Sequence, residues 1–131
     1  MSVLVWVDAW QLQCCGTPFG VGDAVAWRCG DPDPDWLESV LGPDVASRIS
    51  SAEEHHDALP DDHPVTSGTV VEIHAAFCGY APRGTDDRTL YPVPGSAVLQ
   101  EVPHADGSDR DRSDARFTGY VVEVELSPET G

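Results

Sequence analysis

The sequence contains no lysine. Its seven basic residues are all arginines, and they stand against 23 acidic residues for a formal net charge of −16. A chain with so few cations has little with which to displace counterions from a phosphate backbone, and anionic membrane surfaces are disfavoured for the same reason. We therefore expect no nucleic-acid partner and no membrane partner. A protein or peptide partner of basic character, a cation, or simply a solvated acidic surface remain as explanations of the acidity.

The chain also lacks a long apolar segment. Its first residues, MSVLVWVDAWQ, carry no basic stretch and reach Asp8 after a short apolar run, which predicts neither a signal peptide nor a membrane span. Without an export signal, the expected location is the cytoplasm. In that reducing compartment the four cysteines are expected to be free thiols or metal ligands rather than disulfides.

Strand-forming patterns dominate the rest of the chain, and 131 residues suffice for one domain with one core. Alternation assigns Val71, Ile73 and Ala75 to one apolar face of a strand. Trp6 and Trp27 are expected in the core. Runs of β-branched and aromatic residues predict strands at 3–7, 24–29, 68–78, 97–102 and 117–126.

The segment 31–66 interrupts these strands and carries ten acidic residues and one arginine, a net charge of −9. The pair Asp33–Pro34 is typical of a helix start. The apolar residues that follow it form a stripe at helical spacing, which consists of Trp36, Leu37, Val40 and Leu41. The pair Gly42–Pro43 is expected to end this helix. A second helix is predicted from Asp44 to about Glu54.

Together these patterns predict a mainly β fold, a small five-stranded SH3-like barrel with a short helical insertion. The stretch VGD-x-V-x-W followed by GTVVEI resembles the second and third strands of SH3-like barrels. An OB-like barrel, which is also five-stranded, is the alternative. We expect residues 1–131 to form a single β-barrel domain, with 31–66 as an acidic helical insertion. The segment 103–116 has almost no apolar side chain and is expected to be a mobile loop.

Three longer stretches carry a resemblance to a family. They are WVDAWQLQCCGTPFGVGDAVAW near the N-terminus, the central EEHH, and YAPRGTDDRTLYPVPGSAVL. They are similar to a family of small uncharacterised actinobacterial proteins known only as a domain of unknown function, with the N-terminal motif WVDxWQxQCCGxPFxVGDxVxW. The resemblance spans nearly the whole chain. It implies a bacterial cytoplasmic protein and no particular activity.

Cysteine and histidine form the first candidate site. Zinc takes about four nitrogen or sulfur ligands in a tetrahedron, and the predicted ligands are Cys14, Cys15, His55, His56 and Cys78. The usual C-x2-C and H-x3-H spacings are absent, and adjacent residues on a strand point to opposite faces. The alternatives are buried cysteines that act as small apolar residues, or a thiol-dependent enzyme on the same residues. No catalytic residue is assigned, and zinc is the one cofactor considered.

Aromatic and charged residues form the second candidate site, because small barrels often bind peptides through exposed rings. The expected partner-binding residues are Trp10, Tyr80, Arg83, Arg88 and Tyr91, with Asp57, Asp61 and Asp62 attracting a basic surface. We therefore interpret the protein as a non-enzymatic binding module for a protein or peptide, with a structural metal left open. The alternative is a metal- or thiol-dependent enzyme centred on the cysteines and histidines above.

Overall fold

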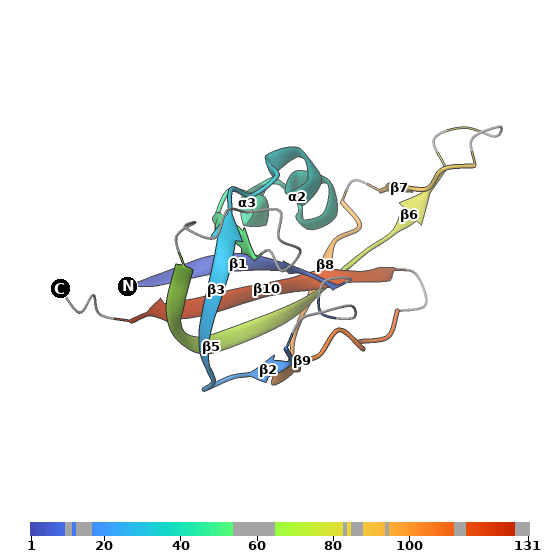
Figure 1. Ribbon diagram of the computed structural model, residues 1–131. Coiled ribbons are helices and arrows are strands. Elements are labelled where there is room, and N and C mark those ends of the chain that lie inside the picture. The colour runs from blue at the N-terminus through green and yellow to red at the C-terminus, as the bar shows by residue number, and fades with distance from the viewer. Residues whose placement is uncertain are drawn as a thin grey trace.

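The computed structural model describes residues 1–9, 12, 17–53, 65–82, 84, 88–93, 95–111 and 115–127. Strands dominate this part of the chain (Figure 1), which confirms the predicted mainly β class. Among the described residues, no helix has the length and apolar character needed to cross a membrane. The elements are β1 (Ser2–Asp8), β2 (Phe19–Gly20), β3 (Ala24–Gly30), α2 (Pro34–Leu41), α3 (Pro43–Ala46), β4 (Ile49–Glu53), β5 (Val65–Cys78), β6 (Tyr80–Ala81), β7 (Tyr91–Pro92), β8 (Val98–Glu101), β9 (His104–Ala105) and β10 (Arg116–Leu126).

The long strands close into a ring. Their order in the main sheet is β10-β1-β4-β3-β5-β8, and β10 pairs with β5 as well. One edge of β5 pairs with β10 from Gly68 to Cys78. The other edge pairs with β3 over 65–69 and with β8 over 74–77. The ring is therefore β1-β4-β3-β5-β10, and β8 extends the sheet beyond it.

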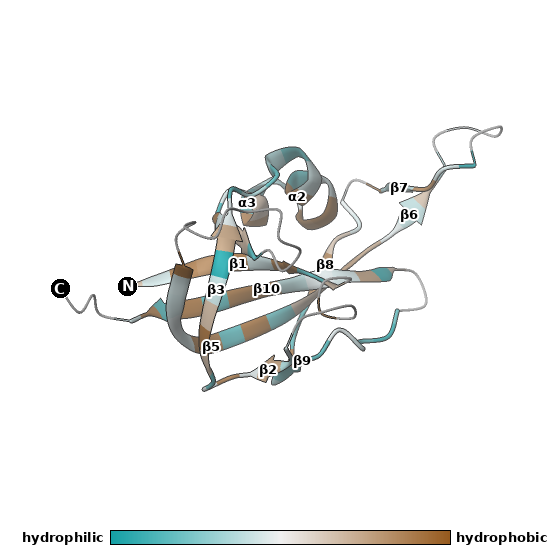
Figure 2. Ribbon diagram, viewed as in Figure 1, coloured by the Kyte–Doolittle hydropathy of each residue, from teal (hydrophilic) through white to brown (hydrophobic). Residues whose placement is uncertain are grey.

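Apolar side chains pack on both faces of this sheet. The inner cluster is built from β1, β3, β5 and β10 and includes Trp27 and Tyr120. The outer cluster joins Trp6 and Val121 on the sheet to Leu37 on α2. Apolar and polar residues alternate along β5 and β10 (Figure 2), as strands with a core on one face require. Both tryptophans expected in the core are buried.

The predicted apolar face of β5 is wrong at one position, Val71. The pairing with β10 shifts register so that Glu123 lies opposite Glu72 while Val124 lies opposite Val70. Val71 is the extra residue of this bulge, and its side chain is 42% exposed. Because a bulge reverses the alternation, Val70 takes the inward position that the pattern had assigned to Val71.

The helical insertion matches the prediction only in its first half. The first helix forms as α2, and the Asp33 carboxylate accepts a hydrogen bond from the Trp36 backbone N–H at 3.1 Å. The predicted second helix over 44–54 is wrong, because α3 ends at Ala46 and residues 49–53 form β4. The sequence ISSAE pairs with both β1 and β3 and buries Ile49, so long-range pairing outweighs a weak local helical preference.

Part of the segment expected to be a mobile loop is tied to the body. β9 pairs with β2, and Ala105 is fully buried. The Tyr120 hydroxyl donates a hydrogen bond to Asp109 and accepts one from the Gly107 N–H at 3.1 Å. These contacts hold residues 104–109 against the inner cluster. That the segment 103–116 is mobile stays a prediction.

Candidate functional site

Most residues of the two predicted sites lie outside the described part of the chain. Within that part, no group of three or more histidine, cysteine or acidic residues is placed to hold a metal ion. The zinc site therefore stays a prediction. The predicted site residues that fall outside the described part are Cys14, Cys15, His55, His56, Trp10, Arg83, Asp57, Asp61 and Asp62.

Cys78, the one predicted metal ligand in the described part, is a fully buried free cysteine at the end of β5. Its Sγ lies 3.4 Å from the Gly79 carbonyl oxygen, 3.4 Å from the Ser96 hydroxyl and 3.8 Å from the Ser39 carbonyl oxygen on α2. The Ser96 hydroxyl also accepts a hydrogen bond from the Gly79 N–H at 2.9 Å. In this arrangement Cys78 fastens α2 to β5 and to the turn that precedes β8.

Cys29, the other described cysteine, is buried in the inner cluster. Burial raises the pKa of its thiol, and the neighbouring Glu53 carboxylate adds to the effect, against hydrogen bonds from Thr66 and Ser51 that lower it. The thiol therefore stays protonated at neutral pH. A protonated, buried thiol is a packing group rather than a nucleophile.

Tyr80 and Tyr91 lie on the two strands of the hairpin β6–β7, in which Tyr80 lies opposite Pro92 and Ala81 lies opposite Tyr91. The two hairpin strands and the described residues between them (80–82, 84 and 88–92) are called the arm below, and β6 and β7 project away from the ring (Figure 1). Both tyrosines are half-buried, and Arg88 is exposed between them in the sequence. Cross-strand partners share a face and neighbouring residues on a strand alternate, so Tyr80 and Tyr91 point to opposite faces of the hairpin. The aromatic partner-binding surface stays a prediction.

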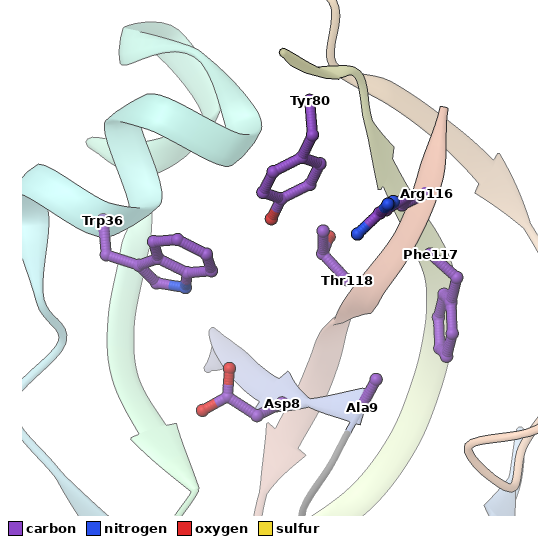
Figure 3. A pocket seen from close by; sticks show the side chains of 7 residues that line it. All are labelled: Asp8, Ala9, Trp36, Tyr80, Arg116, Phe117 and Thr118. Atoms are coloured by element: carbon purple, nitrogen blue, oxygen red, sulfur yellow. The ribbon is translucent and has the colours of Figure 1, made fainter. Parts of the chain in front are cut away.

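A cavity of about 620 Å³ lies between the base of the arm, the start of α2 and the adjoining ends of β1 and β10. We call it the Trp36–Tyr80 pocket. Figure 3 shows the side chains of Trp36, Tyr80, Arg116 and Thr118 around one space, with Asp8 below it. The pocket is therefore built from four segments that are far apart in the sequence.

Trp36 reaches the pocket because of its place on α2. Leu37, Val40 and Leu41 point into the outer cluster and are buried. Trp36 stands at the edge of this apolar stripe and remains 37% exposed. Its indole faces Tyr80 across the pocket (Figure 3). The start of the helix at Asp33 therefore sets the position of one wall of the pocket.

Asp8 is held at the lower side of the pocket by a buried indole. Trp6 Nε1 donates a hydrogen bond to Asp8 Oδ1 at 2.8 Å. The Trp6 ring lies directly over Gly119 on β10, where a Cβ atom would come within 2.7 Å of the ring and 2.5 Å of the Val7 carbonyl oxygen. Only glycine leaves room for the ring at this point.

The opposite wall carries a stacked cation. The guanidinium carbon of Arg116 lies 5.7 Å from the centre of the Tyr80 ring, which is within cation–π range. Burial raises the pKa of the Tyr80 phenol, and the nearby Cys78 adds to this while Arg116 opposes it. The phenol is thus protonated at neutral pH and can donate a hydrogen bond into the pocket.

Thr118 completes this wall through a second bulge. The register of β10 against β5 shifts between Phe117 and Gly119. The Thr118 hydroxyl donates a hydrogen bond to the Ala76 carbonyl oxygen at 3.0 Å, which satisfies an acceptor beside the interrupted ladder. Bulges of this kind often redirect a side chain at a functional site.

The described lining of the pocket offers several kinds of contact to a ligand. This described lining has three aromatic side chains, one carboxylate, one guanidinium and two hydroxyl groups, with neither histidine nor cysteine among them. The pocket can hold a ligand through ring stacking, charge and hydrogen bonds.

Sequence reasoning found Tyr80 but missed Trp36, Asp8 and Arg116. The sequence analysis had assigned Trp36 to the apolar stripe of its helix. Its exposure could have been inferred from the sequence, because Leu37, Val40 and Leu41 already form the buried face and Trp36 lies at the edge of that face. No local signal marks Asp8 or Arg116, because the closure of the sheet brings them together.

The comparisons with known proteins place the chain in a family. Residues 1–126 match a family of unknown function, DUF6578. The chain belongs to this family. No curated protein and no solved structure gives a match. The DUF6578 match includes every residue that lines the Trp36–Tyr80 pocket, and it confirms the resemblance to an uncharacterised domain family drawn from the sequence.

Proposed function

We propose that this DUF6578 protein is a non-enzymatic binding module for a basic protein or peptide, and that the Trp36–Tyr80 pocket seats a basic side chain of the partner. One observation carries the proposal: an exposed indole on an acidic helix opens onto a pocket that holds further aromatic rings and a carboxylate, while its one guanidinium, that of Arg116, is already stacked on Tyr80. Small-molecule and side-chain sites typically combine such apolar walls with a few placed polar groups.

Charge supports a cationic ligand. Trp36 is flanked on its helix by Asp33, Asp35 and Glu38, and the whole chain has a net charge of −16. A potential of this sign attracts a guanidinium or ammonium group and speeds the encounter with a basic surface. Arg116 on Tyr80 already makes the kind of contact that an incoming cation would make with Trp36.

The proposal extends to the scaffold and its setting. The closed ring of strands supports a small barrel of the SH3-like or OB-like kind, on which binding loops commonly surround one end. The proposed setting is the cytoplasm of an actinobacterium, and the arginine-only set of basic residues agrees with a GC-rich genome. The enzyme alternative rests on cysteines and histidines outside the described residues, and no contact of Cys78 favours it.

Titration with three short acetylated and amidated peptides tests the proposal. Their sequences alternate alanine with arginine, glutamine or glutamate, and binding is followed by calorimetry at low salt. We expect the arginine peptide alone to bind. We also expect Trp36→Ala to weaken that binding about tenfold, a loss typical of an aromatic anchor in an interface.

Leu90→Ala is the matched control, because Leu90 is also an exposed apolar residue, on the arm, and does not line the pocket. Attraction to the net charge alone would leave the affinity of both variants at the wild-type value. That outcome, or equal binding of the glutamine peptide, would refute the proposed function.

A further inference from the structure

A second cavity is bordered by the same helix and the same hairpin as the Trp36–Tyr80 pocket, through different residues. It has a volume of about 390 Å³ and is bounded by α2 on one side and by Pro92 and Gly95, at and just beyond the end of the arm, on the other. Pro92 is the cross-strand partner of Tyr80, which lines the first pocket. One helix and one hairpin therefore border both cavities.

This second cavity is acidic. Asp35 and Glu38 on α2 line it, and its described lining contains no basic side chain. Asp35 directly precedes Trp36, so adjacent residues of the helix contribute to the two cavities. On the side of the arm the described lining residues are Pro92 and Gly95, which carry no charge. A cation in this cavity would meet carboxylates from one wall and neutral surface from the other.

Contacts between side chains and backbone connect the two walls of this second cavity. Cys78 and Ser96 connect α2 to the turn before β8 through the contacts of the Cys78 sulfur and the Ser96 hydroxyl. Ser96 also donates a hydrogen bond to the Val93 carbonyl oxygen at 2.6 Å, beside the arm. A preformed space of this kind requires little ordering when a ligand enters, which favours binding.

We infer that the partner segment is dibasic: it runs along α2 between the helix and the arm, with one basic side chain in the Trp36–Tyr80 pocket and a second in the Asp35–Glu38 cavity. This inference rests on the proposed function and specifies its ligand. The first cation is held by a ring and the second by carboxylates. The ligand class is thus a peptide segment with two separated arginine or lysine residues.

Fluorescence anisotropy with labelled alanine peptides tests the inference. One peptide carries a single arginine, and a series carries two arginines separated by one to five alanines. We expect one spacing to bind about fivefold more tightly than the single-arginine peptide, the scale of one or two partly exposed ion pairs. Glu38→Gln should remove much of this advantage, about threefold, and leave the affinity for the single-arginine peptide nearly unchanged.

Glu101→Gln is the matched control, because it makes the same change of net charge at an exposed residue of β8 that lines neither cavity. If Glu101→Gln and Glu38→Gln weaken the two-arginine peptide equally, the second arginine responds only to net charge and the inference is wrong. If Glu38→Gln has no effect while Trp36→Ala still weakens every arginine peptide, the dibasic inference is wrong and the proposed function stands. If Trp36→Ala has no effect on any peptide, the proposed function itself fails.

Discussion

At the scale of single residues, a glycine determines the shape of the pocket, because it has no side chain. Gly119 leaves the space that the Trp6 ring fills, and the Trp6 indole in turn donates its N–H to Asp8. The local sequence TGY gives no indication of this role. It depends on β1 lying opposite β10, where Asp8 and Gly119 are partners. Residues whose importance depends on such pairing are not recognisable from sequence alone.

We predict that Gly119→Ala lowers the free energy of unfolding by about 2 kcal/mol or more, as overpacking against a rigid backbone does. The new Cβ would lie 2.5 Å from the Val7 carbonyl oxygen, which cannot move without distorting β1. Gly84→Ala is the control, since a Cβ there meets no atom within 4 Å. Urea denaturation measures both, and equal stability of the two variants would contradict this view of Gly119.

At the scale of secondary-structure elements, local signals predicted what local interactions determine. The pair Asp33–Pro34 and Gly42 correctly located α2, because capping is decided within one turn of helix. The strand β4 was mistaken for helix, and the face of β5 was misassigned at Val71. Both errors arise where pairing between distant strands overrides the local pattern. The pocket shows the same difference. Sequence reasoning identified Tyr80, which lies in a recognisable loop, and it missed residues that only the pairing of distant strands brings to the pocket.

The capping of α2 leads to a second stability prediction. Asp33→Ala removes the side-chain acceptor of the Trp36 N–H and should cost about 1 kcal/mol of stability. Asp31→Ala removes the same charge from an exposed position before the helix and should change stability little. Thermal unfolding of the two variants separates the cap from the effect of charge. A larger loss for Asp31→Ala would show that repulsion among the acidic residues, and not capping, dominates this helix.

At the scale of the whole molecule, three titrating groups respond to burial in the same direction. The pKa values of Cys29, Tyr80 and Tyr120 are all raised, and in each case burial is the largest cause. For Tyr120 the hydrogen bond to Asp109 adds to the effect. The folded protein therefore holds these three protons more tightly than the unfolded chain, whose groups release them near their ordinary values of 9.0 and 10.0.

Stability should consequently fall as the pH rises above about 9, because the unfolded state then binds fewer protons than the folded state. Below that range the contribution of these groups is fully present. The Tm measured between about pH 8 and pH 11 reports the effect, and Tyr120→Phe should make the decline shallower. A Tm that is constant or rises over this range would show that loss of these protons is not coupled to unfolding.

The central claim, that a basic partner is seated between Trp36 and Tyr80, is tested most directly by nuclear magnetic resonance. The ¹⁵N-labelled protein is titrated with the arginine–alanine peptide, and shifts of backbone amides and of the indole N–H groups are followed. We predict that the largest changes fall on the Trp36 indole N–H and on the amides of Asp8, Tyr80 and Arg116. Shifts spread evenly over the acidic surface, with the Trp36 indole unchanged, would contradict the account.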